Sequence, residues 1–173
     1  MSAGVPAVQV PETLDAWRMV ATRRQFEGRV ALSALPRLQG SLADTEGECS
    51  FTLEFGQDAL QVPFIELALE AGLSLVCQRS LERFVFPVKA VQRLGLIRDE
   101  AQEAALPPGY EPLLVPEDGI LRPLDLVEDE LVLALPVVPV SPDSEPVDRT
   151  WSASEEEQQA ASPFAALAAL KKK

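Results

Sequence analysis

The sequence predicts an α+β fold: an antiparallel β-sheet with flanking helices, an acidic disordered linker and a short C-terminal helix. Through the centre of the chain, apolar and polar residues alternate one by one, which is typical of strands with one buried face. After Pro123 the apolar spacing becomes helical, and Pro136 ends that pattern. The chain has 173 residues, 47% of them hydrophobic, and this is enough to form one hydrophobic core. We therefore expect a single domain over residues 11–140 whose sheet has about four to six strands.

The N-terminal part begins without a periodic pattern and then shows apolar residues at helical spacing. Residues 1–10 have no periodicity, and we expect a flexible N-terminus there. A helix is predicted from Pro11 with Thr13 as its cap, because apolar residues then recur three, four and seven positions apart, at Leu14, Trp17, Val20 and Ala21. A second segment is expected over residues 32–38, interrupted by Pro36.

The central strands are predicted by alternation. Residues 47–55 place Cys49, Phe51, Leu53 and Phe55 on one side. Residues 65–77 place a series of apolar residues at odd positions, namely Ile65, Leu67, Leu69, Ala71, Leu73, Leu75 and Cys77. A helix competes around residues 64–71, and Gly72 marks a bulge or break. Residues 83–90 form the partner strand, with Phe84 and Phe86 facing the core and Pro87 indicating an edge or a bulge.

The C-terminal third is predicted to be mainly helix and linker. Residues 99–108 form an acidic connector with a short helical turn. In the helix after Pro123, Leu124, Val127, Leu131 and Leu135 line one side, and Asp125, Glu128 and Asp129 the other. Residues 137–140 are expected to be extended. Residues 141–162 form an acidic linker, and residues 163–173 form a C-terminal docking helix that presents Phe164, Leu167 and Leu170.

Charge is distributed very unevenly along the chain, whose formal net charge is −12. Residues 41–76 carry seven acids and no bases, giving −7, whereas residues 77–98 carry five bases against one acid, giving +4. Residues 99–170 carry sixteen acids against two bases, giving −14. So acidic a chain is repelled on average by a phosphate backbone, and its natural long-range partner is a basic protein. No apolar run approaches the length of a membrane span and no signal peptide is recognisable, so we expect a cytoplasmic protein without a membrane partner.

Catalytic chemistry is poorly supported by the residues present. The chain contains no histidine, which excludes Ser-His-Asp and Cys-His catalysis and every histidine-based metal site. Paired carboxylates such as Glu128–Glu130 are interpreted as the wet face of a helix rather than as an acid–base pair. Cys49 and Cys77 are interpreted as small buried residues. We therefore expect no enzyme activity, no cofactor, no metal and no small-molecule substrate.

Residues 77–98 carry a net positive charge although the chain as a whole is acidic, and two interpretations of this stretch remain open. Its bases are Arg79, Arg83, Lys89, Arg93 and Arg98. Arg83, Lys89 and Arg93 share strand parity, so they are candidates for contact with RNA phosphates from one sheet face. Equally, these cations would offset the acidic segments within the molecule. The aromatic residues typical of single-strand RNA binding are not interleaved with the arginines on that face.

Three blocks of the sequence carry a resemblance to a known family. They are residues 107–112 (PPGYEP), residues 125–139 (DLVEDELVLALPVVP) and residues 162–171 (SPFAALAALK). Together they resemble the bacterial YceD family of large ribosomal RNA subunit accumulation proteins. Many members of that family carry C-x-x-C at the hairpin turn, a spacing that suits zinc. This chain has Cys77-Gln-Arg-Ser80 there, so no structural zinc is expected.

The resemblance implies a factor that supports the synthesis, processing or stability of 23S ribosomal RNA and the assembly of the large subunit. The expected mechanism is non-enzymatic binding of a basic ribosomal protein or of a large-subunit precursor particle. The candidate partner contacts are Asp125, Glu128, Asp129, Glu130, Phe164, Leu167 and Leu170. An RNA-processing enzyme and a regulatory binding module unrelated to ribosomes are the alternatives; activity on precursor RNA and a pull-down from growing cells would distinguish them.

Overall fold

The structure is a computed structural model that describes residues 10–145. Its largest element is a five-stranded sheet in the order β2-β3-β4-β5-β6, accompanied by the two-stranded pair β1-β7. Along the chain the elements are β1 (Leu14–Asp15), α1 (Ala16–Ala21), β2 (Gln25–Ala31), η1 (Leu32–Ala34), α2 (Pro36–Gln39), β3 (Glu48–Gln57), β4 (Pro63–Val76), β5 (Arg83–Ile97), η2 (Glu100–Ala105), β6 (Glu111–Leu114), β7 (Ile120–Leu121) and α3 (Pro123–Ala134).

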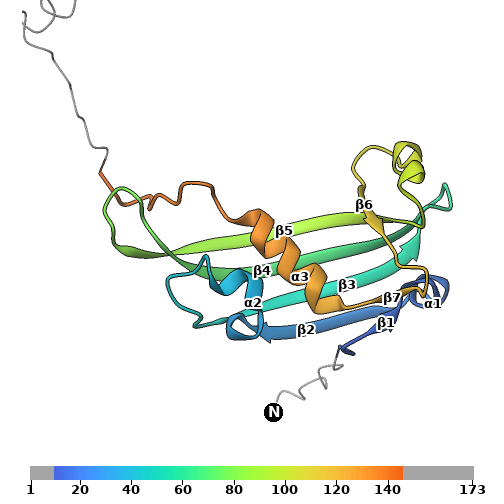
Figure 1. The fold of residues 1–173 in the computed structure, drawn as a ribbon, viewed down its shortest axis with the longest axis horizontal. Coiled ribbons are helices and arrows are strands. Elements are labelled where there is room, and N and C mark those ends of the chain that lie inside the picture. The colour runs from blue at the N-terminus through green and yellow to red at the C-terminus, as the bar shows by residue number, and fades with distance from the viewer. Residues whose placement is uncertain (1–9, 146–173) are drawn as a thin grey trace, which may run out of the picture.

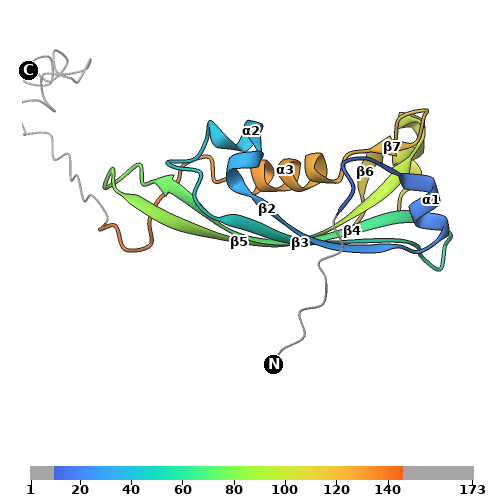
Figure 2. The ribbon, with the colours of Figure 1, turned by 90° about the horizontal axis from the view of Figure 1, so that it is seen from below.

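The helices α1, α2 and α3 all lie on one face of the sheet (Figures 1 and 2). The core forms between that face and the helices, and it includes the buried residues Leu32, Leu38, Leu53, Phe55, Leu67 and Leu131. This packing explains the alternation in the sequence, because every second side chain of each strand enters the core. The opposite face of the sheet carries the charged side chains of the strands together with a few exposed apolar residues such as Val85 and Val91. The α+β class is confirmed.

The central hairpin confirms the strands predicted from alternation. β4 and β5 pair without interruption from Phe64↔Gly95 to Val76↔Arg83. The predicted bulge or break at Gly72 is therefore wrong, because Gly72 pairs with Pro87 within this ladder, and the competing helix at residues 64–71 is wrong too. Within residues 10–145, Pro87 lies where β5 has one neighbouring strand, as the edge alternative required.

The N-terminal helix begins later than predicted. Leu14 and Asp15 form β1, which pairs with Leu121 and Ile120 of β7, so the cap is Asp15 rather than Thr13. Asp15 Oδ1 accepts the N–H of Arg18 at 3.0 Å. At residues 32–38 the chain forms η1 and then α2, and Pro36 starts α2 instead of interrupting a longer helix, since its missing N–H costs nothing in the first helical turn.

Four strands were not predicted, namely β1, β2, β6 and β7. β2 buries only Phe26 and Val30, a pattern too short to stand out in sequence. β6 pairs with β5 in parallel, which departs from the purely antiparallel sheet that was expected. β7 pairs with β1, more than a hundred positions earlier, and β6 has only four residues, so local periodicity carries little information about either strand.

Between residues 99 and 136 the helices agree with prediction in their positions. The connector contains η2, which Asp99 caps, and α3 starts at Pro123 and ends before Pro136. Residues 137–140 form no strand; the carbonyl of Pro139 instead accepts the N–H of Gln78 at 2.8 Å. Phe164, Leu167 and Leu170 and most of the predicted linker lie outside the described residues. Among the helices of residues 10–145, none is long and apolar enough to cross a membrane.

Candidate interaction surfaces

Glu128 of α3 is buried and caps another helix. Only 3% of Glu128 is exposed. Its Oε1 accepts the backbone N–H groups of Arg37 (2.6 Å) and Leu38 (3.2 Å), and its Oε2 accepts Nε–H of Arg37 (3.0 Å). These N–H groups belong to the first turn of α2, where the residue at the cap position, Leu35, offers no side-chain acceptor. A carboxylate from 91 positions away in the sequence thus replaces the missing local cap.

This cap corrects the predicted faces of α3. Glu128 was expected on the exposed side with Asp125 and Asp129, whereas Leu124 was expected in the core but is 36% exposed. The buried members of the helix are Pro123, Leu126, Val127, Glu128 and Leu131. Burial of the Glu128 carboxylate is stable because three donors surround it.

Arg37 joins the cap to the acidic surface of α3. Its guanidinium pairs with both Asp129 and Glu128, and hydrogen bonds to these two carboxylates raise the pKa of Arg37. Asp125 and Asp129 keep about half of their side chains exposed, at 53% and 50%. The acidic surface of α3 therefore consists of Asp125, Asp129 and Glu130.

Glu130 lies in a different environment from the other two acids. Its side chain is half-buried, and desolvation raises the pKa of Glu130, with further contributions from the neighbouring carboxylates of Glu111 and Asp129. Within residues 10–145 it forms no ion pair. An approaching cation would relieve this excess of negative charge.

The basic residues of β5 share one face, but two of them are already engaged in ion pairs. Arg83, Lys89 and Arg93 are exposed at alternating positions, as strand parity predicted. Arg83 pairs with Asp44 and also reaches Ser74 Oγ at 3.3 Å, and Arg93 Nε lies 3.0 Å from Glu66 Oε2. Lys89 forms no ion pair within the described residues. Intramolecular charge balance therefore accounts for part of this stripe.

The remaining two basic residues lie beyond the ends of β5. Arg79 donates to the carbonyl of Ser144 (3.0 Å), and the Arg98 guanidinium stacks 4.0 Å from the ring centroid of Trp17. At about 3.3 Å per residue, Arg79 and Arg98 are separated by most of the length of the sheet. The five cations form a dispersed line rather than a compact patch.

Tertiary structure brings two aromatic rings to Arg93 that the sequence analysis did not place there. The Arg93 guanidinium lies 4.7 Å from the Phe64 ring centroid and 5.8 Å from that of Tyr110, and these rings meet edge to face. The Tyr110 hydroxyl donates to Asp58 Oδ2 at 2.8 Å, and desolvation and Asp58 together raise the pKa of Tyr110. No local pattern signals this cluster, because its members come from β4, β5 and two loops.

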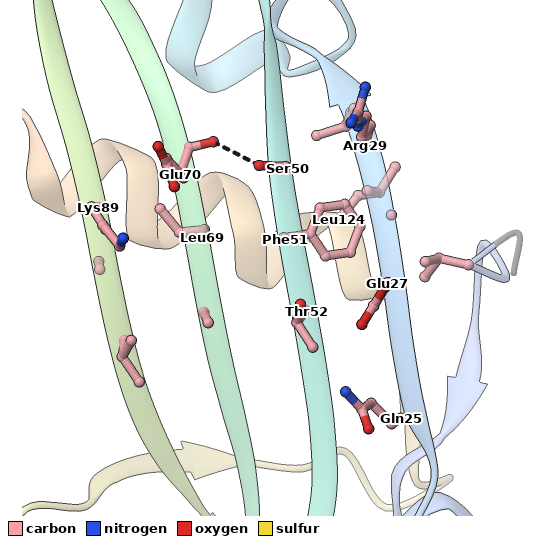
Figure 3. Close-up of a pocket in the computed structure, with 16 residues that line it drawn as sticks. Gln25, Glu27, Arg29, Ser50, Phe51, Thr52, Leu69, Glu70, Lys89 and Leu124 are labelled. Atoms are coloured by element: carbon pink, nitrogen blue, oxygen red, sulfur yellow. Dashed lines mark hydrogen bonds between the residues drawn. The ribbon is translucent and has the colours of Figure 1, made fainter. Parts of the chain in front are cut away.

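The uncovered face of the sheet contains a shallow hollow of about 970 Å³ (Figure 3). Arg29, Ser50, Glu70 and Lys89 lie side by side across four strands there, and Ser50 Oγ donates to the carbonyl of Glu70. On this face the strands between residues 25 and 95 carry five acids against four bases, a net charge of −1; they are Glu27, Glu48, Glu54, Glu66 and Glu70, and Arg29, Arg83, Lys89 and Arg93. Its open form and exposed charges suit a macromolecular surface better than an enclosed small-molecule site.

The two cysteines differ in chemistry although both are buried. Burial raises the pKa of the Cys49 thiol to about 11. The sulfur of Cys77 accepts backbone N–H groups from Arg79, Ser80 and Ser141 at 3.3–3.4 Å. Hydrogen bonds from Ser80, first its side chain and then its backbone, lower the pKa of Cys77 to about 6. The interpretation as a plain apolar residue therefore fits Cys49 but is incomplete for Cys77, which joins the hairpin turn to the segment after α3.

Comparison with known proteins supplies a family context for these surfaces. A family model described as "Large ribosomal RNA subunit accumulation protein YceD" matches residues 65–171, a range that includes β4, β5 and α3. A protein of Haemophilus influenzae named "Large ribosomal RNA subunit accumulation protein YceD" is 30% identical over 172 residues, which cover 96% of this chain and 98% of that relative. No solved structure matches significantly.

Proposed function

The chain belongs to the YceD family of large ribosomal RNA subunit accumulation proteins, and from this premise we propose that it supports accumulation of large-subunit (23S) ribosomal RNA by binding a basic large-subunit protein, free or within a precursor particle. In this role it acts as a binding factor without chemistry of its own. The basic protein stays shielded until it meets ribosomal RNA. It then assembles with the RNA, and the assembled RNA is spared from degradation.

The observation that carries this proposal is the charge of the molecule. A net charge of −12 attracts basic proteins over long range, and ribosomal proteins that contact RNA must be basic. Asp125, Asp129 and Glu130 offer carboxylates on one helix, whereas Glu128 is engaged in capping α2 and is left out of the proposed surface. Rim charges of this kind chiefly raise the association rate.

A non-enzymatic mechanism is supported by the side chains available. The chain has no histidine, and the carboxylates of the hollow on the sheet are exposed, so they lack the dry surroundings that prepare a general acid. A second role, direct contact with RNA, is proposed for the line of cations, with Lys89 as its most available member and Arg79, Arg83, Arg93 and Arg98 as weaker contributors. The tail residues Phe164, Leu167 and Leu170 remain proposed docking residues.

The proposed function is tested by deletion and complementation. Deleting the gene should lower the ratio of 23S to 16S ribosomal RNA, measured by quantitative electrophoresis, and should reduce large subunits in sucrose gradients. Complementation uses a variant with Asp125→Asn, Asp129→Asn and Glu130→Gln, which should restore the ratio only partly.

The matched control removes three acids from elsewhere on the surface, by Glu100→Gln, Glu103→Gln and Glu117→Gln, and should restore the ratio fully. An unchanged RNA ratio and normal gradients in the deletion strain, during both slow and cold growth, would refute the proposal.

A further inference from the structure

The hydrogen bonds of the β4–β5 hairpin show which backbone N–H and C=O groups of β5 point toward its outer edge. The N–H of Cys77 donates to the carbonyl of Glu82 at 2.9 Å, so this pair of the β4–β5 hairpin is hydrogen-bonded. Hydrogen-bonded and non-hydrogen-bonded pairs alternate in an antiparallel ladder. Even-numbered residues of β5 therefore bond to β4, and odd-numbered residues turn their N–H and C=O groups outward. Pro87, which has no N–H, is odd-numbered, and the Ile97 carbonyl accepts the N–H of Val115 (2.8 Å) just beyond β6.

Only one end of this edge is paired with another strand. β6 pairs with Leu94–Ile97, and within residues 10–145 no strand pairs with the outer edge of β5 between Arg83 and Arg93. In Figure 1, β5 borders the sheet and β6 lies beside its far end only. The N–H groups of Lys89, Val91 and Arg93 thus point outward in line with β6, where an extended chain would continue the sheet.

Apolar side chains flank this edge on both faces of the sheet. Val85 and Val91 are 68% and 65% exposed on the uncovered face, and Phe86 is half-buried on the other. α3 packs against β5 on the helix-covered face (Figure 2). Leu133 of α3, 72% exposed, lies one turn after Glu130 and so shares its side of the helix.

A segment of a basic protein and a second copy of this chain are the candidate binders at this edge, and charge distinguishes between them. Positions 128 and 130 of a helix lie about 200° apart, so Glu130 faces away from α2. It lies on the side of α3 toward Glu111, the first residue of β6. The half-buried Glu130 carboxylate has two acidic neighbours and no ion pair within the described residues, which favours a partner with a cation. A second copy fits less well, because an antiparallel pairing of two copies centred on Lys89 would bring their two Lys89 ammonium groups together.

We propose that the outer edge of β5, from Val85 to Arg93, binds an extended protein segment as an added strand, and that Glu130 selects a lysine or arginine in that segment. Main-chain hydrogen bonds to the odd-numbered residues supply affinity, and Val85 and Val91 contact its apolar side chains. The inference rests on the proposed function, because it assigns the basic large-subunit protein a place and a mode of binding.

The test uses purified large-subunit ribosomal proteins of the same organism, presented one at a time to the full-length chain by biolayer interferometry. The tightest binder is then added to ¹⁵N-labelled protein, and amide hydrogen exchange is followed by NMR. Exchange at Lys89, Val91 and Arg93 should slow on binding, while Ala90 and Gln92, already bonded to β4, should change little. Such alternation is specific to an added strand.

Two pairs of variants accompany the exchange measurement. Val91→Pro removes one outward N–H without touching the β4 ladder and should weaken binding at least about tenfold, whereas Val91→Thr keeps that N–H and nearly the same shape and should bind within about twofold. Glu130→Gln should weaken binding several-fold and flatten its salt dependence, and Glu117→Gln should do neither.

Each other outcome overturns a stated part of the reasoning. Binding that leaves the three outward amides unprotected refutes the edge while sparing the proposed function. Failure of every large-subunit protein to bind refutes the proposed function and the edge together. Strand addition at β5 is also refuted if its outward amides are already protected from exchange in the free protein, whether by a second copy or by residues 146–173. It is refuted as well if ribosomal RNA, and not protein, slows exchange at these amides.

Discussion

Removing the Glu128 carboxylate should destabilise the whole domain. Glu128→Ala leaves the N–H groups of Arg37 and Leu38 without their acceptor, and Leu38 is fully buried. Loss of a helix cap costs about 0.5–2 kcal/mol, and loss of hydrogen bonds to a charged group costs about 1.5–3 kcal/mol. Because these contributions overlap, we expect a loss of about 2–4 kcal/mol in the free energy of unfolding. At about 3 °C per kcal/mol, the melting temperature should fall by roughly 6–12 °C.

Urea and thermal denaturation followed by circular dichroism measure this effect, and two variants separate its causes. Arg37→Ala removes the ion pair but keeps the backbone cap, so it should cost only about 1 kcal/mol. Asp129→Asn, the control on the same helix, removes a half-exposed carboxylate and should cost less than about 1 kcal/mol. The capping argument is refuted if Glu128→Ala costs no more than Asp129→Asn.

Two further predictions concern the hairpin turn and the tail. In a Cys49→Ala background, the thiolate absorbance of Cys77 near 240 nm should titrate with a midpoint near pH 6. Because folding lowers the pKa of Cys77, the Cys49→Ala protein should be more stable than the double variant that also carries Cys77→Ala. This difference in the free energy of unfolding should grow as the pH rises from about 6 to 8.5 and vanish below that range. A midpoint above pH 8 would contradict the hydrogen-bonded sulfur. Truncation after Ser162 should abolish binding to large-subunit precursors with almost no change in melting temperature if residues 163–173 are a docking segment; a fall of several degrees would show that they pack on their own domain.

Elements whose side chains alternate or recur with a clear period were predictable from sequence. Cys49, Phe51, Leu53 and Phe55 identified β3 because strand geometry alone sends every second side chain to one face. Pro123 and Pro136 bounded α3 because proline acts on the adjacent backbone wherever it stands. Charge imbalance is likewise a property of composition, so the proposal of a basic partner needed no structure.

Tertiary structure decided which side chains meet, and this changed the interpretation of single residues. Helical periodicity placed Glu128 with Asp125 and Asp129, yet the start of α2 lies beside it and turns an apparently exposed acid into a buried cap. The arrival of Phe64 and Tyr110 at Arg93, and of Ser141 at Cys77, depends in the same way on segments far apart in sequence. Sequence therefore predicted the elements with a clear period and the sign of the charge, because these arise from local geometry and composition. The acids available to a partner and the open edge of β5 were decided only by folding, because a hydrogen-bond partner is chosen by proximity in space.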